Sequence, residues 1–130
     1  MLYKMKNKFS SSWGRSTQPR KQRKYRFNAP LHIKQKFMRA HLSKELRKKY
    51  SKRNFSLRKG DNVKIMRGQF KNKQGKIERV NLKGTFVYIT GIEVAKRDGT
   101  KTLFPIHPSN LMITEMNMDD KIRQQMLERK

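Results

Sequence analysis

The pattern of apolar and polar positions changes near residue 60. From Gly60 onward, short β-branched and aromatic segments alternate with polar residues and are separated by glycines, which is typical of short strands. The pattern predicts strands over 63–65, 76–80, 86–90, 93–95, 101–105 and 111–113. Asp98-Gly99 predicts a tight hairpin turn. Because an open sheet of such strands would leave exposed edges, we expect a mainly β fold with a small barrel.

Before residue 60 the apolar spacing favours helices. Pro30 precedes apolar residues at roughly helical spacing through Leu42, so a helix is expected to begin near this proline. Ser43 is expected to cap a second helix over 44–50, with an acid in its first turn and bases in its last. Leu46 and Tyr50, four positions apart, would share its buried side.

A last helix is expected at the C-terminal end. Asp119 is in position to cap a helix that continues to Lys130. Ile122 and Met126, four positions apart, would form its docking side, against the barrel or a neighbouring molecule. Among the eight methionines, three occupy positions typical of core packing: Met38, Met66 and Met112.

Positive charge is strong and unevenly distributed. The 130 residues contain 34 Lys and Arg but 9 Asp and Glu, for a net charge of +25. Residues 1–59 contain 20 of these bases and a single acid, whereas residues 60–130 contain 14 bases and 8 acids. Self-repulsion on this scale requires a polyanion, and phosphate backbones are the common cellular choice. We therefore expect nucleic acid as the partner.

Charge and pattern together divide the chain into four parts. Residues 1–28 are too polar and basic to fold unaided and are expected to form an RNA-binding arm. Residues 29–59 form a basic helical extension, residues 60–116 the barrel, and residues 117–130 the C-terminal helix. Ordering the arm would require binding, since burial within the arm cannot offset its entropy.

Several classes of chemistry are disfavoured. The chain has no cysteine, which excludes disulfides, thiolate zinc sites and cysteine nucleophiles. Its three histidines fall in separate segments, so no metal site and no cofactor are expected. Asp61 and Glu78 are each surrounded by bases, which predicts surface ion pairs rather than a catalytic pair, and no enzyme activity is expected. The absence of a long apolar run or a signal-type stretch favours a cytoplasmic location without membrane insertion.

Residues 58–91 carry the most specific motif. They predict a strand, a basic loop and a second strand centred on Gly75, where Gly68 and Gly75 permit backbone positions that a Cβ would obstruct. This arrangement resembles the KOW motif. The flanking segments QPRKQRK (18–24), NAPLHI (28–33), AHLSKEL (40–46) and IHPSNL (106–111) resemble the archaeal and eukaryotic form of large-subunit ribosomal protein twenty-four, called twenty-six in eukaryotes. Residues 1–17 depart from the pattern of this family.

The resemblance implies an SH3-like KOW barrel that binds large-subunit ribosomal RNA early in assembly. It also implies a place near the polypeptide exit tunnel, neighbouring ribosomal proteins as partners, and no homo-oligomer. Two other classes share part of the pattern. KOW-class transcription elongation factors normally add a polymerase-binding α/β domain, for which 130 residues with a basic arm leave no space. A DNA-compacting protein would match the charge but not the flanking segments.

The expected RNA contacts are cations and polar side chains in the basic segments, which seek phosphates rather than base edges. They are Arg20, Lys21, Arg23, Lys24, Arg26, His32, Lys34, Lys36, Arg39, Lys44, Arg47, Lys48, Lys49, Lys52, Arg53, Arg58, Lys59, Arg67, Lys71, Lys73, Lys76, His107, Ser109 and Asn110. His107 would either pack in a turn or bond RNA. The arm aromatics Phe9, Trp13, Tyr25 and Phe27 would either stack on bases or pack against a neighbouring protein.

Overall fold

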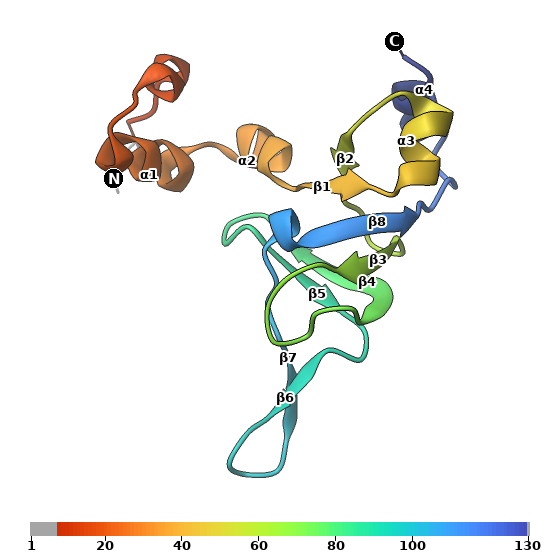
Figure 1. Ribbon diagram of the computed structural model, residues 1–130. Helices are drawn as coiled ribbons and strands as arrows, with labels where there is room; N and C mark the ends of the chain where they lie inside the picture. Colours follow the sequence, from red (N-terminus) through yellow and green to blue (C-terminus); the bar gives the residue numbers. More distant parts are fainter. Residues whose placement is uncertain (1–7, 130) are drawn as a thin grey trace, which may run out of the picture.

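The computed structural model describes residues 8–129, and most of its strands belong to one curved sheet (Figure 1). The sheet has the order β2-β1-β8-β3-β4-β5. Its strands are β1 (Arg39–Leu42), β2 (Asn54–Ser56), β3 (Asn62–Ile65), β4 (Gln74–Asn81), β5 (Phe86–Ile89) and β8 (Leu111–Glu115). The expectation of a mainly β fold is therefore confirmed, and helices flank the sheet at both ends of the chain.

A two-stranded ribbon extends away from this sheet, as Figure 1 shows. It consists of β6 (Glu93–Ala95) and β7 (Lys101–Leu103), which pair antiparallel. At its tip the Asp98 side chain accepts hydrogen bonds from both the backbone N–H and the hydroxyl of Thr100, and Gly99 has a φ of 88°. The predicted Asp-Gly hairpin turn is confirmed.

The six-stranded sheet curves around its core but does not form a closed barrel. The edge strands β2 and β5 do not pair with each other among the described residues, so the ladder remains open. Register shifts occur in the β3–β8 and β4–β5 pairs, and such irregularities bend strands. The bent sheet surrounds fully buried aliphatic residues, listed here: Val63, Ile65, Ile77, Val87, Ile89, Leu111 and Ile113.

The helix predicted from Pro30 to Leu42 is only half right. α2 (Leu31–Phe37) begins after Pro30, but the chain then becomes strand β1. In β1, Ala40 and Leu42 are buried while their neighbours are exposed, and this strand pairs with β2 on one side and β8 on the other. The segment 29–59 therefore contributes two strands to the sheet and is not wholly helical. Pairing on both edges overrides the weak helical pattern.

The predicted cap of the next helix is confirmed. α3 (Lys44–Tyr50) begins after Ser43, whose hydroxyl accepts a hydrogen bond from the backbone N–H of Leu46. Glu45 lies in its first turn, and Ser51 ends it in the left-handed conformation with a φ of 56°. Leu46 and Tyr50 are half-buried and pack against the core, as their spacing predicted.

The last helix differs from the prediction in its cap and in its buried side. α4 (Lys121–Glu128) is capped by Asp120, not Asp119. Ile122 and Met126 are 64% and 40% exposed, while the buried residues are Arg123 and Leu127. Both pairs are four positions apart, so the spacing alone could not tell which pair lies on the buried side of α4, and the prediction chose the exposed pair.

The prediction that three methionines pack in the core is confirmed only in part. Met38 is buried, Met112 is half-buried and Met66 is 42% exposed.

A buried ion pair explains the orientation of α4. The Arg123 guanidinium donates to both carboxylate oxygens of Asp61 at 2.6 Å, and also to the carbonyls of Asn117 and Ser56. Asp61 also accepts from the backbone N–H groups of Arg58 and Asn117. The Asp61 side chain is fully buried, so the prediction of a surface ion pair there was wrong. Both terminal nitrogens of Arg123 and both carboxylate oxygens of Asp61 have partners, as a buried charge requires.

Candidate nucleic-acid interface

Nearly all of the predicted RNA-contacting residues lie on the surface. Of the 24, 20 are exposed, and the half-buried ones are Lys34, Lys52, His107 and Asn110. They come from α1 (Arg20, Lys21, Arg23, Lys24, Arg26), α2 (His32, Lys34, Lys36), β1 (Arg39), α3 (Lys44, Arg47, Lys48, Lys49), the segments around β2 (Lys52, Arg53, Arg58, Lys59), the β3–β4 loop (Arg67, Lys71, Lys73), β4 (Lys76) and the turn η2 with its cap (His107, Ser109, Asn110). The structure distributes them over several elements, and only Arg58 and Lys59 among them line the groove described below.

Few of these cations have an acidic partner. Among residues 8–129, only two ion pairs form: Arg123 with Asp61, and Arg58 with Asp120. The second is exposed, and the hydrogen bond from Arg58 lowers the pKa of the Asp120 carboxyl below its usual value. The cations of α1 and α3 therefore keep their charge free for an external anion. Such a surface is suited to phosphate neutralisation.

Three of the predicted cations donate hydrogen bonds to backbone carbonyls of the protein itself. Lys34 donates from Nζ to the carbonyl of Lys83 at 3.4 Å, and Lys52 donates from Nζ to the carbonyl of Met126. Arg47 donates from Nε to the carbonyl of Leu42 at 3.0 Å. These contacts join segments distant in the sequence or anchor a helix end. For these residues, a structural role competes with an RNA contact.

The arm contains structure that its composition did not predict. A short 3-10 helix η1 (Ser11–Arg15) is followed by α1 (Pro19–Asn28), which begins with a proline at its first turn. Neither element buries a residue, and Figure 1 shows them at one side of the molecule, joined to the sheet through α2. Within the arm, η1 and α1 thus form an exposed helical unit and not an extended chain.

Aromatic contacts hold this unit together. Phe9 packs against Trp13 and Tyr25, with ring centroids 5.9 and 5.3 Å apart, and Tyr25 contacts Phe37 of α2 at 5.9 Å. Lys24 places its ammonium 4.8 Å from the centre of the Trp13 ring. Three of the four named arm aromatics thus pack within the chain. The sequence-based alternatives, stacking on bases or packing against a neighbouring protein, did not include this arrangement. The fourth, Phe27, is 81% exposed.

Gly68 of the β3–β4 loop and Gly75 of β4 have the backbone constraints predicted for them. Gly68 has a φ of 97°, which a residue with a Cβ rarely adopts. At Gly75 the constraint is space, because a Cβ there would lie 2.7 Å from Ile89 Cγ2 and 2.8 Å from the carbonyl oxygen of Thr90. Phe70 is buried and anchors the loop, while Arg67 and Lys71 are exposed. The loop therefore presents cations from a fixed backbone.

His107 lies beside this loop and has a clear structural role. Its Nδ1 accepts a hydrogen bond from the backbone N–H of Ser109 at 3.2 Å, which caps the 3-10 helix η2 (Pro108–Asn110), and lies 2.8 Å from the Ser109 hydroxyl. Partial burial, followed by the charge of Arg26, lowers the pKa of His107 below its usual value. The carbonyl of Asn110 accepts from Met66 N–H at 2.7 Å and ties this turn to the loop. Of the two sequence-based alternatives for His107, packing in a turn is present.

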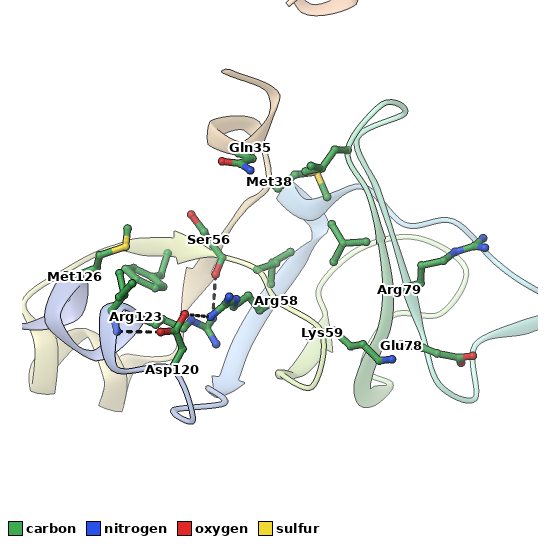
Figure 2. Close-up of a pocket in the computed structure, with 15 residues that line it drawn as sticks. Gln35, Met38, Ser56, Arg58, Lys59, Glu78, Arg79, Asp120, Arg123 and Met126 are labelled. Atoms are coloured by element: carbon green, nitrogen blue, oxygen red, sulfur yellow. Dashed lines mark hydrogen bonds and ion pairs between the residues drawn. The ribbon is translucent and has the colours of Figure 1, made fainter. Parts of the chain in front are cut away.

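A groove of about 780 Å³ lies between α4, β2 and β4 (Figure 2). Leu57, Val80 and Leu82 contribute to its apolar lining, and Lys59 and Arg79 are among its charged residues. Figure 2 shows Arg123 bonded to Ser56 within the same region.

Among the residues that the structure describes, no group of three or more histidines and carboxylates could hold a metal ion. No helix of residues 8–129 is long and apolar enough to span a bilayer.

Comparison with known proteins identifies the class. A family model that describes the eukaryotic ribosomal proteins L26 and the archaeal ribosomal proteins L24 matches residues 16–130. The chain is 50% identical over 114 residues to large ribosomal subunit protein uL24 of Methanothrix thermoacetophila, covering 88% of this chain and 98% of that protein. It is 49% identical over 115 residues to the uL24 protein of Methanosphaera stadtmanae, with the same coverage.

The matches define a ribosomal structural protein and not an enzyme. The chain belongs to the family of ribosomal proteins called L26 in eukaryotes and L24 in archaea. The family predicted from the flanking segments is thus confirmed. The match begins at residue 16, so most of the segment that departed from the family pattern lies outside it.

Proposed function

We propose that this protein binds large-subunit ribosomal RNA as a structural constituent of the cytoplasmic ribosome. The observation that carries the proposal is the exposed cationic surface of α1 and α3, whose side chains form no ion pair within residues 8–129. Family membership and the names of the two relatives support the ribosome as the setting. The protein would join the subunit early in assembly, near the polypeptide exit tunnel, beside other ribosomal proteins and as a single copy.

The four segments have separate tasks in this proposal. Residues 1–28 act as the RNA-binding arm, and residues 29–59 add basic helices and two strands that anchor the arm to the sheet. Residues 60–116 form an SH3-like KOW unit, a proposal supported by the bent strands around one aliphatic core and by the constrained glycines Gly68 and Gly75. In residues 117–130, Arg123 attaches the C-terminal helix to this unit by its contact with Asp61. Because α1 buries no residue, RNA binding would add to the aromatic contacts that hold it in place.

The salt dependence of RNA binding tests the arm. Deleting residues 1–28 removes nine bases and no acid. Binding to large-subunit ribosomal RNA should weaken, and the slope of log affinity against log salt should become shallower by up to about 6 to 8. Circular dichroism melting without RNA should change little, because the deleted elements bury no residue. An unchanged salt slope would remove the arm from the interface.

A matched pair of variants tests the face of α3. Lys48→Ala with Lys49→Ala removes two exposed cations from the proposed interface, and Lys96→Ala with Arg97→Ala removes two exposed cations from the tip of the β6–β7 ribbon. The first pair should reduce the salt slope by about 1.4 to 1.8, while the ribbon pair should leave it unchanged. Equal reductions would mean that binding follows net charge and not this surface.

Sedimentation separates the proposal from the two other classes. In a sucrose gradient at moderate salt, the protein should travel with large ribosomal subunits. Travel with RNA polymerase would instead indicate a transcription elongation factor, and travel with chromosomal DNA a DNA-compacting protein.

A further inference from the structure

Phe27 differs from every other aromatic residue of the arm that the structure describes. Its side chain is 81% exposed, whereas Phe9, Trp13 and Tyr25 pack with one another. Phe27 follows Tyr25 by two positions, which places the two side chains on nearly opposite sides of α1. Phe27 therefore cannot join the cluster of Phe9, Trp13 and Tyr25, although exposing a phenyl ring to water is unfavourable. The ring is therefore available to a partner outside the chain.

The face that carries Phe27 also carries two guanidinium groups. Arg23 and Arg20 lie four and seven positions before Phe27, so all three share one side of α1. Both arginines are exposed, and neither forms an ion pair within the described residues. At about 1.5 Å per residue, the row extends about 10 Å along the helix. The row combines an aromatic ring with cations on a helix that contains no acid.

The partner that fits this row is a nucleic-acid strand with an unpaired base. A phenyl ring stacks on the flat face of a base, while guanidinium groups bind the phosphates that precede or follow it. A duplex would satisfy the arginines but leave the ring in water, because its bases are already stacked. An apolar pocket of another protein would satisfy the ring but leave two cations to be desolvated without an anion.

We propose that Phe27 stacks on an unpaired RNA base while Arg20 and Arg23 neutralise phosphates of the same strand. The proposal rests on the RNA-binding function proposed above and adds a target class, single-stranded or bulged nucleotides, together with the residue that recognises them. Stacking is tolerant of sequence, since every base has a π face. The row therefore selects unpaired RNA and not a particular base.

Two RNA probes test the proposal with the full-length protein. One is a hairpin whose loop of unpaired adenosines contains 2-aminopurine, and the other is a fully paired duplex of the same nucleotide number. Phe27→Ala should weaken binding to the loop hairpin by about 5- to 150-fold and leave duplex affinity unchanged. Stacking should also quench 2-aminopurine fluorescence with the wild-type protein but not with this variant.

Three further variants serve as controls. Phe27→Tyr keeps an aromatic ring and should retain both affinity and quenching. Leu31→Ala removes a neighbouring side chain that is 51% exposed but not aromatic, and it should have no effect. Arg23→Ala should reduce the salt slope for both RNAs by about 0.7 to 0.9, whereas Phe27→Ala should leave the slope unchanged.

The outcomes distinguish this proposal from the one it rests on. If the wild-type protein bound neither RNA, nor large-subunit ribosomal RNA, the RNA-binding function itself would fail. If it bound both but Phe27→Ala changed neither affinity nor quenching, stacking would be overturned while RNA binding stood. If Phe27→Ala weakened the affinity for hairpin and duplex equally, stacking would also be overturned, because Phe27 would then stabilise the arm and not recognise an unpaired base. If the Phe27→Ala protein bound both RNAs normally but was no longer incorporated into large ribosomal subunits, Phe27 would contact a neighbouring protein and stacking would be overturned.

Discussion

Breaking the buried ion pair between Asp61 and Arg123 should strongly destabilise the fold. Arg123→Met keeps an apolar stem of similar length but removes the guanidinium that contacts both Asp61 oxygens at 2.6 Å. Asp61 would then remain fully buried, with only the backbone N–H groups of Arg58 and Asn117 as donors. Removing one partner of such a pair costs about 3 to 5 kcal/mol, mainly because the remaining charge is uncompensated.

Arg58→Met provides the matched control. It breaks the other Arg–Asp pair near α4, but in that pair the side chains of Arg58 and Asp120 are 53% and 36% exposed. Exposed pairs contribute about 0 to 1 kcal/mol, and the backbone N–H of Arg58 still bonds Asp61 in this variant. The two substitutions are chemically identical and differ in burial.

Urea unfolding followed by circular dichroism measures the difference. With an m-value of about 2 kcal/mol/M, Arg123→Met should lower the unfolding midpoint by about 2 M, and Arg58→Met by less than about 0.5 M. Adding Asp61→Asn to Arg123→Met should recover part of the loss, because the buried carboxylate charge is then gone. Equal midpoints for the two single variants would refute the assignment of a buried, stabilising contact between α4 and the start of β3.

Three further predictions concern the core, Gly75 of β4 and His107. Ile65→Ala, at a side chain 1% exposed, should reduce the free energy of unfolding by about 2 to 5 kcal/mol, whereas Lys49→Ala should barely change it in the same urea titration. Gly75→Ala should cost about 1 to 3 kcal/mol, because the new Cβ would meet Ile89 and a backbone carbonyl; a melting temperature equal to wild type would contradict that crowding. Because the folded-state pKa of His107 is lowered, the unfolded chain binds more protons below pH of about 6.5, so stability should fall as pH drops through that window. His107→Asn should flatten this part of the profile of melting temperature against pH.

The β region was predictable because its signals are local. Alternation at Val63 and Ile65, the Asp-Gly turn of the ribbon and the Ser43 cap each depend on residues within a few positions of one another. The family resemblance depended on short segments as well. The positions of the exposed cations followed from charge, since unpaired Lys and Arg seldom become buried.

What escaped prediction depends on contacts between distant residues. Strand β1 was assigned to a helix because its four residues gain their conformation from β2 and β8 and not from their own pattern. The pairing of Asp61 with Arg123 links positions 62 apart, and nothing local distinguishes Arg123 from Lys121, the other base on α4. Likewise, the aromatic contacts that leave only Phe27 exposed among the described arm aromatics required the relative placement of η1, α1 and α2.

The position of β8 has a consequence for the order in which the chain can fold. This strand is the last of the sheet to be synthesised, yet it lies between β1 and β3 and pairs with both. Until residue 113 is available, β1 with β2 and the meander of β3, β4 and β5 have no shared ladder, and each exposes an unpaired edge. Joining residues 41 and 112 also closes a long loop, which slows folding relative to local pairing. A nascent chain that ends before β8 therefore consists of a basic N-terminal part and a separate meander, and a single late strand insertion joins the two.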